Sequence, residues 1–224
     1  MEFYKHYDSI KQAYRLNGYL LDAAPGTGKT ITSITLSHLL NKDVFIAIVP
    51  KNSLKNVWEK TFSTLFKSPV KLWTSLLPGD APIDCSHYAF HYESLDKAIE
   101  LAKKLRTIGK SIFIDLDECH NFNTIDSNRT FLFGELCKVA QCKDVLWMSG
   151  TPIKAIGKEV IPLLRTIDPY FTNIVEKNFI EIFGKNTSKA LEILAARLGI
   201  VKFTIQKTQV NKIETNYYRG DVLV

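Results

Sequence analysis

Short apolar stretches alternate with longer amphipathic ones along most of the chain. Six short stretches predict buried strands, because branched and aromatic side chains dominate them; they are residues 19–23, 43–50, 70–74, 86–92, 111–118 and 144–150. Apolar residues at helical spacing predict helices before Gly18, around 31–40, and at 53–62, 94–105 and 128–140. This alternation predicts an α/β fold, in which helices flank a mostly parallel central sheet and ligands bind at the carboxyl ends of the strands.

The pattern changes after Ile153. Amphipathic spacing predicts helices that form a small extension over about 153–200, and two strand-like segments follow; the helices are 159–167, 178–183 and 189–198, and the segments 200–206 and 213–218. With 224 residues and 46% hydrophobic content, the chain has the size of one globular domain. We therefore expect residues 1–224 to form one unit with an appended extension.

Composition adds little to this picture. Lys and Arg total 29 against 23 Asp and Glu, and the resulting net charge of +6 mildly favours a polyanionic partner such as nucleic acid. The four cysteines show neither metal-ligand spacing nor disulfide density, so we expect reduced thiols and no structural zinc. No signal peptide or membrane-spanning run is evident, and a cytoplasmic protein is expected, or a nuclear one in a eukaryote.

The first candidate site follows the first predicted strand, where residues 23–30 read AAPGTGKT. Glycines let such a loop turn so that backbone N–H groups approach phosphate oxygens at the start of a helix. A lysine in this position neutralises the outer phosphates, and the following threonine ligates Mg²⁺. The candidate nucleotide-binding residues are Pro25, Gly26, Thr27, Gly28, Lys29 and Thr30. The strict Walker A pattern has glycine where this chain has Ala23, but the flanking strand and helix supply the expected context.

A second candidate site ends the predicted strand at 111–118. Asp117 and Glu118 are adjacent carboxylates, and nucleotide hydrolysis needs one carboxylate near the metal ion and another to orient water. We expect Asp117 to ligate Mg²⁺ and Glu118 to act as the catalytic base. A solvent-facing acidic strand end is the ordinary alternative, but it does not explain why the pair lies downstream of a phosphate loop.

Several segments resemble the motifs of superfamily 2 helicases. Residues 117–120, DECH, resemble motif II (the DEAD/DEAH box), and residues 149–152, SGTP, resemble motif III. The chain is most similar to the Swi/Snf-like branch, because residues 48–62, 91–95 and 148–171 resemble its motifs Ia, Ib and the motif III region. The resemblance implies a RecA-like P-loop NTPase lobe that uses ATP and Mg²⁺ and acts on nucleic acid, most often double-stranded DNA.

The same resemblance implies roles for matching positions. The nucleic-acid contacts would be Lys51, Asn52 and Ser53. A strand end, a lysine and a helix start capped by Ser53 also suit an anion, although a capped surface helix is the ordinary alternative. Ser149 and Thr151 would couple hydrolysis to strand binding, and His120, otherwise a core histidine, would bridge motifs II and III.

Three departures from the family pattern matter. The adenine-reading glutamine of this branch falls near His6, which makes His6 the candidate at that position and Tyr4 or Tyr7 the candidates for stacking on a base. Cys119 replaces a small residue of the box, and no redox role is expected for it. The arginine pattern of a second RecA-like lobe, Q-x-x-G-R-x-x-R, does not occur, so we expect that lobe to lie outside this chain.

The preferred interpretation is the ATP-binding lobe of an ATP-dependent DNA translocase or helicase, with little turnover by the lobe alone. One alternative is a stand-alone nucleotide-binding or interaction module without motor activity. Another is an unrelated P-loop enzyme such as a nucleotide kinase, but the arginine-rich lid expected of a kinase is not visible.

Overall fold

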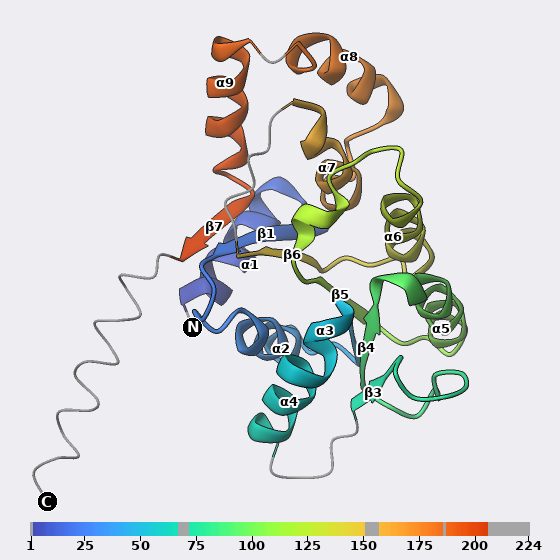
Figure 1. The fold of residues 1–224 in the computed structure, drawn as a ribbon. Helices are drawn as coiled ribbons and strands as arrows, with labels where there is room; N and C mark the ends of the chain where they lie inside the picture. Colours follow the sequence, from blue (N-terminus) through green and yellow to red (C-terminus); the bar gives the residue numbers. More distant parts are fainter. Residues whose placement is uncertain (1, 67–71, 151–156, 186, 206–224) are drawn as a thin grey trace, which may run out of the picture.

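A computed structural model describes residues 2–66, 72–150, 157–185 and 187–205. The strands of this described part are β1 (Gly18–Ala23), β2 (Val44–Val49), β3 (Leu72–Thr74), β4 (His87–His91), β5 (Ile112–Leu116), β6 (Val145–Ser149) and β7 (Lys202–Ile205). They form one sheet in the order β3-β4-β2-β5-β6-β1-β7, and every described pair is parallel (Figure 1). The predicted parallel sheet is therefore confirmed, and the loops that follow β1, β2, β5 and β6 share its carboxyl edge.

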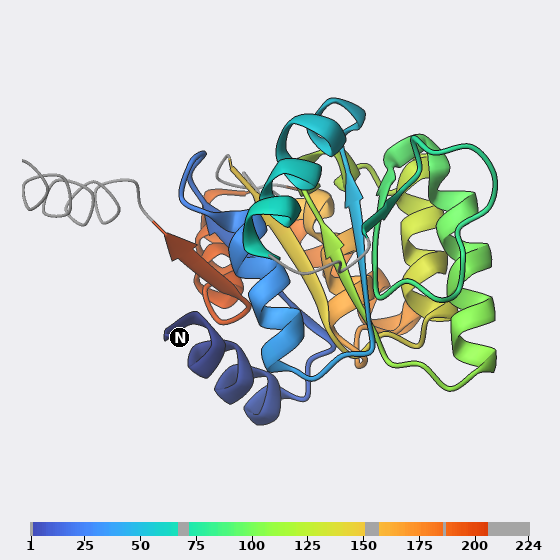
Figure 2. The same cartoon turned by 90° about the horizontal axis from the view of Figure 1, so that it is seen from below.

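Helices cover both faces of the sheet. They are α1 (Glu2–Tyr14), α2 (Lys29–Leu39), α3 (Lys51–Ser53), α4 (Lys60–Leu65), α5 (Leu95–Thr107), α6 (Asn128–Val139), α7 (Ile161–Ile167), α8 (Asn173–Phe183) and α9 (Ser188–Leu198). Figure 2 shows α5 and α6 on the opposite side of the sheet from α1 and α2. Because strand side chains alternate, Ile46 and Ile48 of β2 enter one apolar core while Phe45 and Ala47 enter the other. Among the described helices, none has the length and apolarity needed to span a membrane.

The described residues from 157 onward form the predicted helical extension and then a strand that returns to the sheet. Helices α8 and α9 lie beyond one end of the sheet, and β7 pairs with β1 at its edge (Figure 1). Helix α8 begins five residues earlier than predicted, because the Thr172 side chain accepts a hydrogen bond from the N–H of Val175 and caps it. The predicted strand at 200–206 is confirmed, whereas 213–218 lies outside the described residues.

The helix predicted at 53–62 starts earlier and is irregular. It begins at Lys51, directly after Pro50, and passes through a π-helical segment (Leu54–Glu59) into α4. The prediction that Ser53 caps this helix is wrong: Ser53 lies in the first turn, and its hydroxyl donates to the carbonyl of Pro50 at 2.8 Å. The predicted apolar face remains, since Trp58 is fully buried.

Asp144, a fully buried carboxylate at the amino edge of the sheet, holds three elements together. It accepts a hydrogen bond from the Tyr7 hydroxyl at 2.8 Å and forms ion pairs with Lys11 and Lys42. A buried charge is tolerated only when it is paired and hydrogen-bonded. These contacts therefore fasten α1 and the turn after α2 to the start of β6.

Two histidines meet between α2 and β4. The Nε2 atoms of His38 and His87 lie 3.3 Å apart, and His87 is only 4% exposed, with its ring packed against Phe62 and Phe45. Burial lowers the pKa of His87 to about 4, and the neighbouring His38 acts in the same direction.

We expect this histidine to make the fold less stable in mild acid. In the unfolded chain His87 takes up its proton near pH 6.5, but in the folded chain it stays neutral down to about pH 4. The free energy of unfolding is therefore unaffected by the titration of this histidine above pH 6.5. It falls by up to about 3 kcal/mol as the pH decreases from 6.5 to about 4. Urea unfolding at pH 7 and pH 4.5 would show a larger loss for the wild type than for His87→Gln, and equal losses would contradict the prediction.

Candidate nucleotide-binding site

The loop between β1 and α2 has the backbone geometry of a phosphate cradle. Gly26 and Gly28 adopt left-handed conformations, with φ of 81° and 86°, that favour glycine. A Cβ atom at either position would meet no atom of the described residues within 4 Å, so those residues leave the space beside the backbone open. Gly28 is also the N-cap of α2, and no side chain caps this helix start. The N–H groups of its first turn are therefore left for an anionic ligand.

Lys29 lies over this loop. Its ammonium donates to the carbonyl of Ala23 at 2.9 Å, and the Thr27 hydroxyl donates to the carbonyl of Ala24 at 2.7 Å. The acceptor of Lys29 is a neutral carbonyl, so its positive charge is not compensated there and suits a phosphate. The alanine at position 23 is compatible with the loop, because it is the buried last residue of β1. Thr30 follows in the first turn of α2.

Asp117 follows β5 at the same edge of the sheet. It is buried, and its carboxylate accepts hydrogen bonds from Nε1 of Trp58 at 3.3 Å and from the N–H of Glu118 at 3.0 Å. Burial raises the pKa of Asp117, whereas the Trp58 hydrogen bond and the charge of Lys29 act in the opposite direction. A bound cation would favour the charged form, as a metal ligand requires.

Glu118, Lys29 and Gly150 bring three distant segments together. Glu118 has a φ of 48°, a left-handed conformation that non-glycine residues seldom adopt outside functional sites and tight turns. A Cβ atom on Gly150 would lie 3.1 Å from Nζ of Lys29 and 3.5 Å from Oε1 of Glu118. The phosphate loop, the end of β5 and the end of β6 therefore meet at a glycine without a side chain to fill the space. The sequence analysis identified the segment 149–152 but not Gly150 as a site residue.

Asp115 is a second residue that the sequence analysis missed. It lies two positions before Asp117 on the same face of β5 and is fully buried, and neither carboxylate oxygen has a hydrogen-bond partner among the described residues. Burial raises the pKa of Asp115 well above its usual value, and the charge of Asp117 adds to the effect. An acidic residue inside an otherwise apolar strand was the signal that could have identified it.

The remaining motif II and III residues are only partly placed by the structure. Nδ1 of His120 lies 3.4 Å from Oε2 of Glu118, and Ser149 is fully buried at the end of β6. Thr151 lies outside the described residues, so the coupling roles of these three residues stay predictions. Cys119 is buried, which raises the pKa of its thiol well above the usual value and favours the neutral form.

Two of the three candidates for base recognition are engaged in other contacts. The prediction that Tyr7 stacks on a base is wrong, because its side chain is fully buried and its hydroxyl donates to Asp144. Nε2 of His6 lies 2.6 Å from the Tyr19 hydroxyl, and its ring packs against Phe203 with 5.2 Å between centroids. His6 as an adenine contact therefore stays a prediction.

Tyr4 is better placed for a base. It lines a hollow of about 260 Å³ between α1 and α2, together with Ile31, Thr32 and Ile205. Ile31 and Thr32 belong to the first turns of the helix that begins at the phosphate loop. An aromatic and aliphatic wall beside that loop suits a flat base.

These residues fit a magnesium nucleotide. The open, left-handed glycines and the uncapped start of α2 can accept phosphates next to Lys29. Mg²⁺ prefers oxygen ligands and is usually held by one or two protein groups together with substrate phosphates. The Thr30 hydroxyl and the buried Asp117 carboxylate supply oxygens of this kind.

The predicted nucleic-acid contacts lie at the end of β2, on the same edge of the sheet. Lys51 and Asn52 are exposed, and Ser53 is half-buried in the first turn of the helix. No ion pair of Lys51 is found among the described residues. Its charge lowers the pKa of His91, although burial is the larger cause. His91 in turn contacts Ser75 and Ser94, so Lys51 acts on a histidine that is held by two serine hydroxyls.

The segment resembling motif Ib, residues 91–95, contacts the turn that carries motif II. The Tyr92 hydroxyl donates to the carbonyl of Asp117 at 2.7 Å, and the Arg129 guanidinium lies 4.8 Å from the centre of the Tyr92 ring. Arg129 also forms an ion pair with Glu93 at 3.2 Å. The turn that carries Asp117 and Glu118 is therefore held by the segment after β4.

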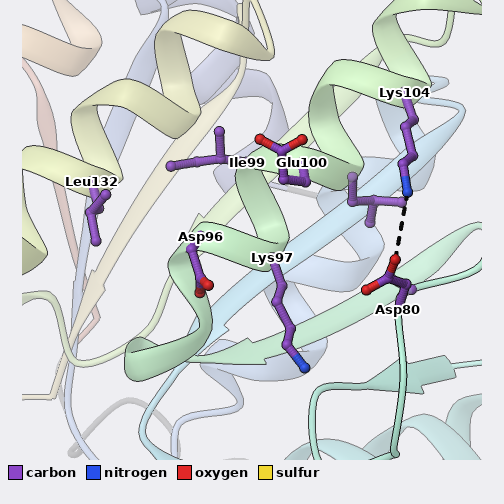
Figure 3. Close-up of a pocket in the computed structure, with 9 residues that line it drawn as sticks. Asp80, Asp96, Lys97, Ile99, Glu100, Lys104 and Leu132 are labelled. Atoms are coloured by element: carbon purple, nitrogen blue, oxygen red, sulfur yellow. Dashed lines mark ion pairs between the residues drawn. The ribbon is translucent and has the colours of Figure 1, made fainter.

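A separate hollow of about 500 Å³ lies beside α5 (Figure 3). None of the residues that line it belongs to the phosphate loop, motif II or motif III. Its side chains are of mixed charge, with Asp80, Asp96 and Glu100 against Lys97 and Lys104, and Lys104 forms an ion pair with Asp80 at 3.9 Å. The three acidic and two basic side chains sum to a charge of only −1, so the hollow offers little net charge to a ligand.

Comparison with known proteins identifies the family. The model of the type III restriction enzyme res subunit matches residues 4–154. The chain belongs to this family. A search of curated proteins gives no match to this res-subunit family member.

Two solved structures share its fold. The Sulfolobus solfataricus SWI2/SNF2 ATPase core in complex with dsDNA has a TM-score of 0.69 and 20% identity, covering 92% of this chain and 43% of that one. The SWI2/SNF2 ATPase core domain of the same organism has a TM-score of 0.67 and 18% identity, covering 94% and 44%. The predicted fold, a RecA-like lobe with a parallel central sheet, is thus confirmed. The res-subunit family member spans less than half the length of each SWI2/SNF2 chain.

Proposed function

We propose that this chain is the ATP-binding lobe of an ATP-dependent motor that moves along duplex DNA. The observation that carries the proposal is the convergence of Lys29 and Glu118 on Gly150. A phosphate-binding ammonium, a carboxylate able to orient water and an open glycine form the arrangement that nucleotide hydrolysis needs. The fold likeness to an ATPase core solved with dsDNA supports DNA as the track.

Each residue of the site has a distinct task in this proposal. The backbone of residues 25–28 and the ammonium of Lys29 bind and orient the phosphates, while Thr30 and Asp117 hold Mg²⁺. When bound, Mg²⁺ neutralises charge on the phosphates and lets them accept a nucleophile. Glu118 positions the attacking water and takes its proton, and Tyr4 packs against the base.

Coupling to DNA would pass through the end of β6. Ser149 pairs in register with Asp22 of β1, the strand that leads into the phosphate loop. A displacement of the segment 149–152 by bound DNA would therefore act directly beside the nucleotide. We assign this role to Ser149 and Thr151, and His120, whose Nδ1 lies 3.4 Å from Oε2 of Glu118, would hold Glu118.

DNA binding by this lobe is the experiment that tests the proposed track. Lys51, Asn52 and the helix start at residues 51–53 should contact phosphates, so duplex binding should be weak, independent of sequence and strongly reduced by salt. Lys51→Ala should weaken binding to all sequences alike. It should also reduce, by about 1, the magnitude of the slope of log binding constant against log salt concentration. Fluorescence anisotropy with labelled duplexes at several salt concentrations would measure both quantities.

The matched control is Lys177→Ala, which removes an exposed lysine on α8. It should leave duplex affinity unchanged. Affinity that does not depend on salt, or an equal effect of the two substitutions, would contradict the assignment of Lys51.

A further inference from the structure

A hollow of about 610 Å³ lies at the amino edge of the sheet, opposite the edge that carries the nucleotide loop. It is formed by the last turns of α5, α6 and α7 and by the loops before β1 and β6; the polar residues that line it include Asn17, Arg106, Lys138, Gln141, Lys143 and Arg165. Its volume falls within the range of small-ligand sites, which is about 300–1,000 Å³. None of these residues has a part in the proposed nucleotide or DNA contacts.

The charge of this hollow is entirely positive. Among the described residues that line it, four are basic and none is acidic, in contrast to the mixed charges beside α5. Arg165 is neutralised by two hydrogen bonds to Glu176, at 2.6 and 2.7 Å. Arg106, Lys138 and Lys143 form no ion pair within the described residues, so three positive charges remain uncompensated.

Arg106 has a donor without an acceptor. Its Nη1 donates to the carbonyl of Lys110 at 3.1 Å and its Nη2 to Oε1 of Gln141 at 2.9 Å, and both acceptors are neutral. Its Nε is buried and has no partner among the described residues. Buried donors are nearly always paired in folded proteins. The guanidinium is thus fixed in orientation, while its Nε–H lacks an acceptor and its charge lacks an acidic partner among the described residues.

Helix-end electrostatics explains part of this cluster. Arg106 and Lys138 lie in the last turns of α5 and α6, where cations compensate the helix dipole. This effect does not account for Lys143, which lies in the loop before β6, or for the unpaired Nε of Arg106. An anion in the hollow would compensate the charges of Lys143 and Arg106.

We infer that this hollow binds a phosphate group. A guanidinium held by Gln141 offers a directional donor, and Lys138 and Lys143 add two point charges, which is a combination suited to phosphate oxygens. The phosphate could belong to a nucleic-acid backbone or to a free phosphate compound. The inference does not depend on the proposed motor function, because the hollow and the nucleotide loop lie at opposite edges of the sheet.

The first arm of the test uses inorganic phosphate and the whole 224-residue chain. Backbone amide NMR signals of Gln141 and Lys143 should shift saturably in the wild type, and these shifts should vanish in Lys138→Gln/Lys143→Gln. Both lysines are exposed, so the substitutions should not disturb folding. The control Lys177→Gln/Lys189→Gln removes two exposed lysines elsewhere and should keep the shifts. Signals of the nucleotide loop report phosphate binding there separately.

The second arm uses a 20-base-pair duplex as the probe and identifies the source of the phosphate. If the source is a DNA backbone, Lys138→Gln/Lys143→Gln should weaken duplex binding about tenfold and reduce the salt slope by about 2 relative to the control. Amide shifts with unchanged duplex binding would assign the hollow to a free phosphate compound. If phosphate does not shift the two amides saturably and duplex binding equals that of the control, the inference is overturned.

Discussion

Glu118→Gln is expected to abolish ATP hydrolysis by the complete motor while leaving ATP bound. The substitution removes the carboxylate that orients and deprotonates water, but it keeps Asp117 and Thr30 for Mg²⁺. In the proposed mechanism this carboxylate lies beside Gly150 and Lys29. Steady-state hydrolysis and nucleotide titration of a two-lobe protein would measure both effects.

The same experiment tests the need for a second lobe. An arginine finger contributes roughly 10³ to 10⁵ to the rate in P-loop hydrolases, and the resemblance places such arginines in the second lobe. The 224-residue chain should therefore bind ATP but hydrolyse it close to background, with or without DNA. Glu192→Gln, which changes an exposed carboxylate on α9, should leave turnover of the two-lobe protein unchanged. Robust DNA-stimulated turnover by residues 1–224 alone would contradict the two-lobe mechanism.

Lys29→Ala is expected to remove detectable binding of Mg-ATP and Mg-ADP. Within the described part of the chain, the ammonium of Lys29 bonds to the neutral carbonyl of Ala23 and forms no ion pair, so the substitution removes the positive charge offered to the phosphates without breaking an ion pair found there. Thermal unfolding should thus be little changed, while isothermal calorimetry should show the loss of affinity.

Lys177→Ala is again the matched control, because it removes one positive charge from an exposed position on α8. It should keep nucleotide affinity. If Lys29→Ala and Lys177→Ala bind ATP equally well, the assignment of residues 25–30 to phosphate binding is wrong.

The sequence pattern was sufficient for the order and type of most elements. The six apolar runs predicted strands, and in the structure these strands form a parallel sheet with helices on both faces. The prediction succeeded because a strand that is buried on both faces has a continuous apolar sequence. The phosphate loop and the Asp117-Glu118 pair were also readable, since glycines, lysine and adjacent carboxylates at strand ends are local signals.

Local signals were less reliable at helix starts. Ser53 has the side chain of an N-cap, yet the helix begins two residues earlier because Pro50 already has the extended conformation of a capping position. Tyr7 likewise looked available for a base, but its burial against Asp144 depends on how α1 lies on the sheet. Exposure of a side chain is a property of packing and not of sequence position.

The sequence by itself predicted the fold class and the family resemblance and identified Lys29, Asp117 and Glu118 as candidate site residues, because each prediction depends on residue type and short spacing. Only the tertiary structure decided that Lys29 and Glu118 meet at Gly150, that Asp144 fastens α1 to the sheet and that cations from three helices and a loop line one hollow. These features join residues more than a hundred positions apart or on different elements. Strand order and helix placement bring them together, and no local pattern encodes those distances.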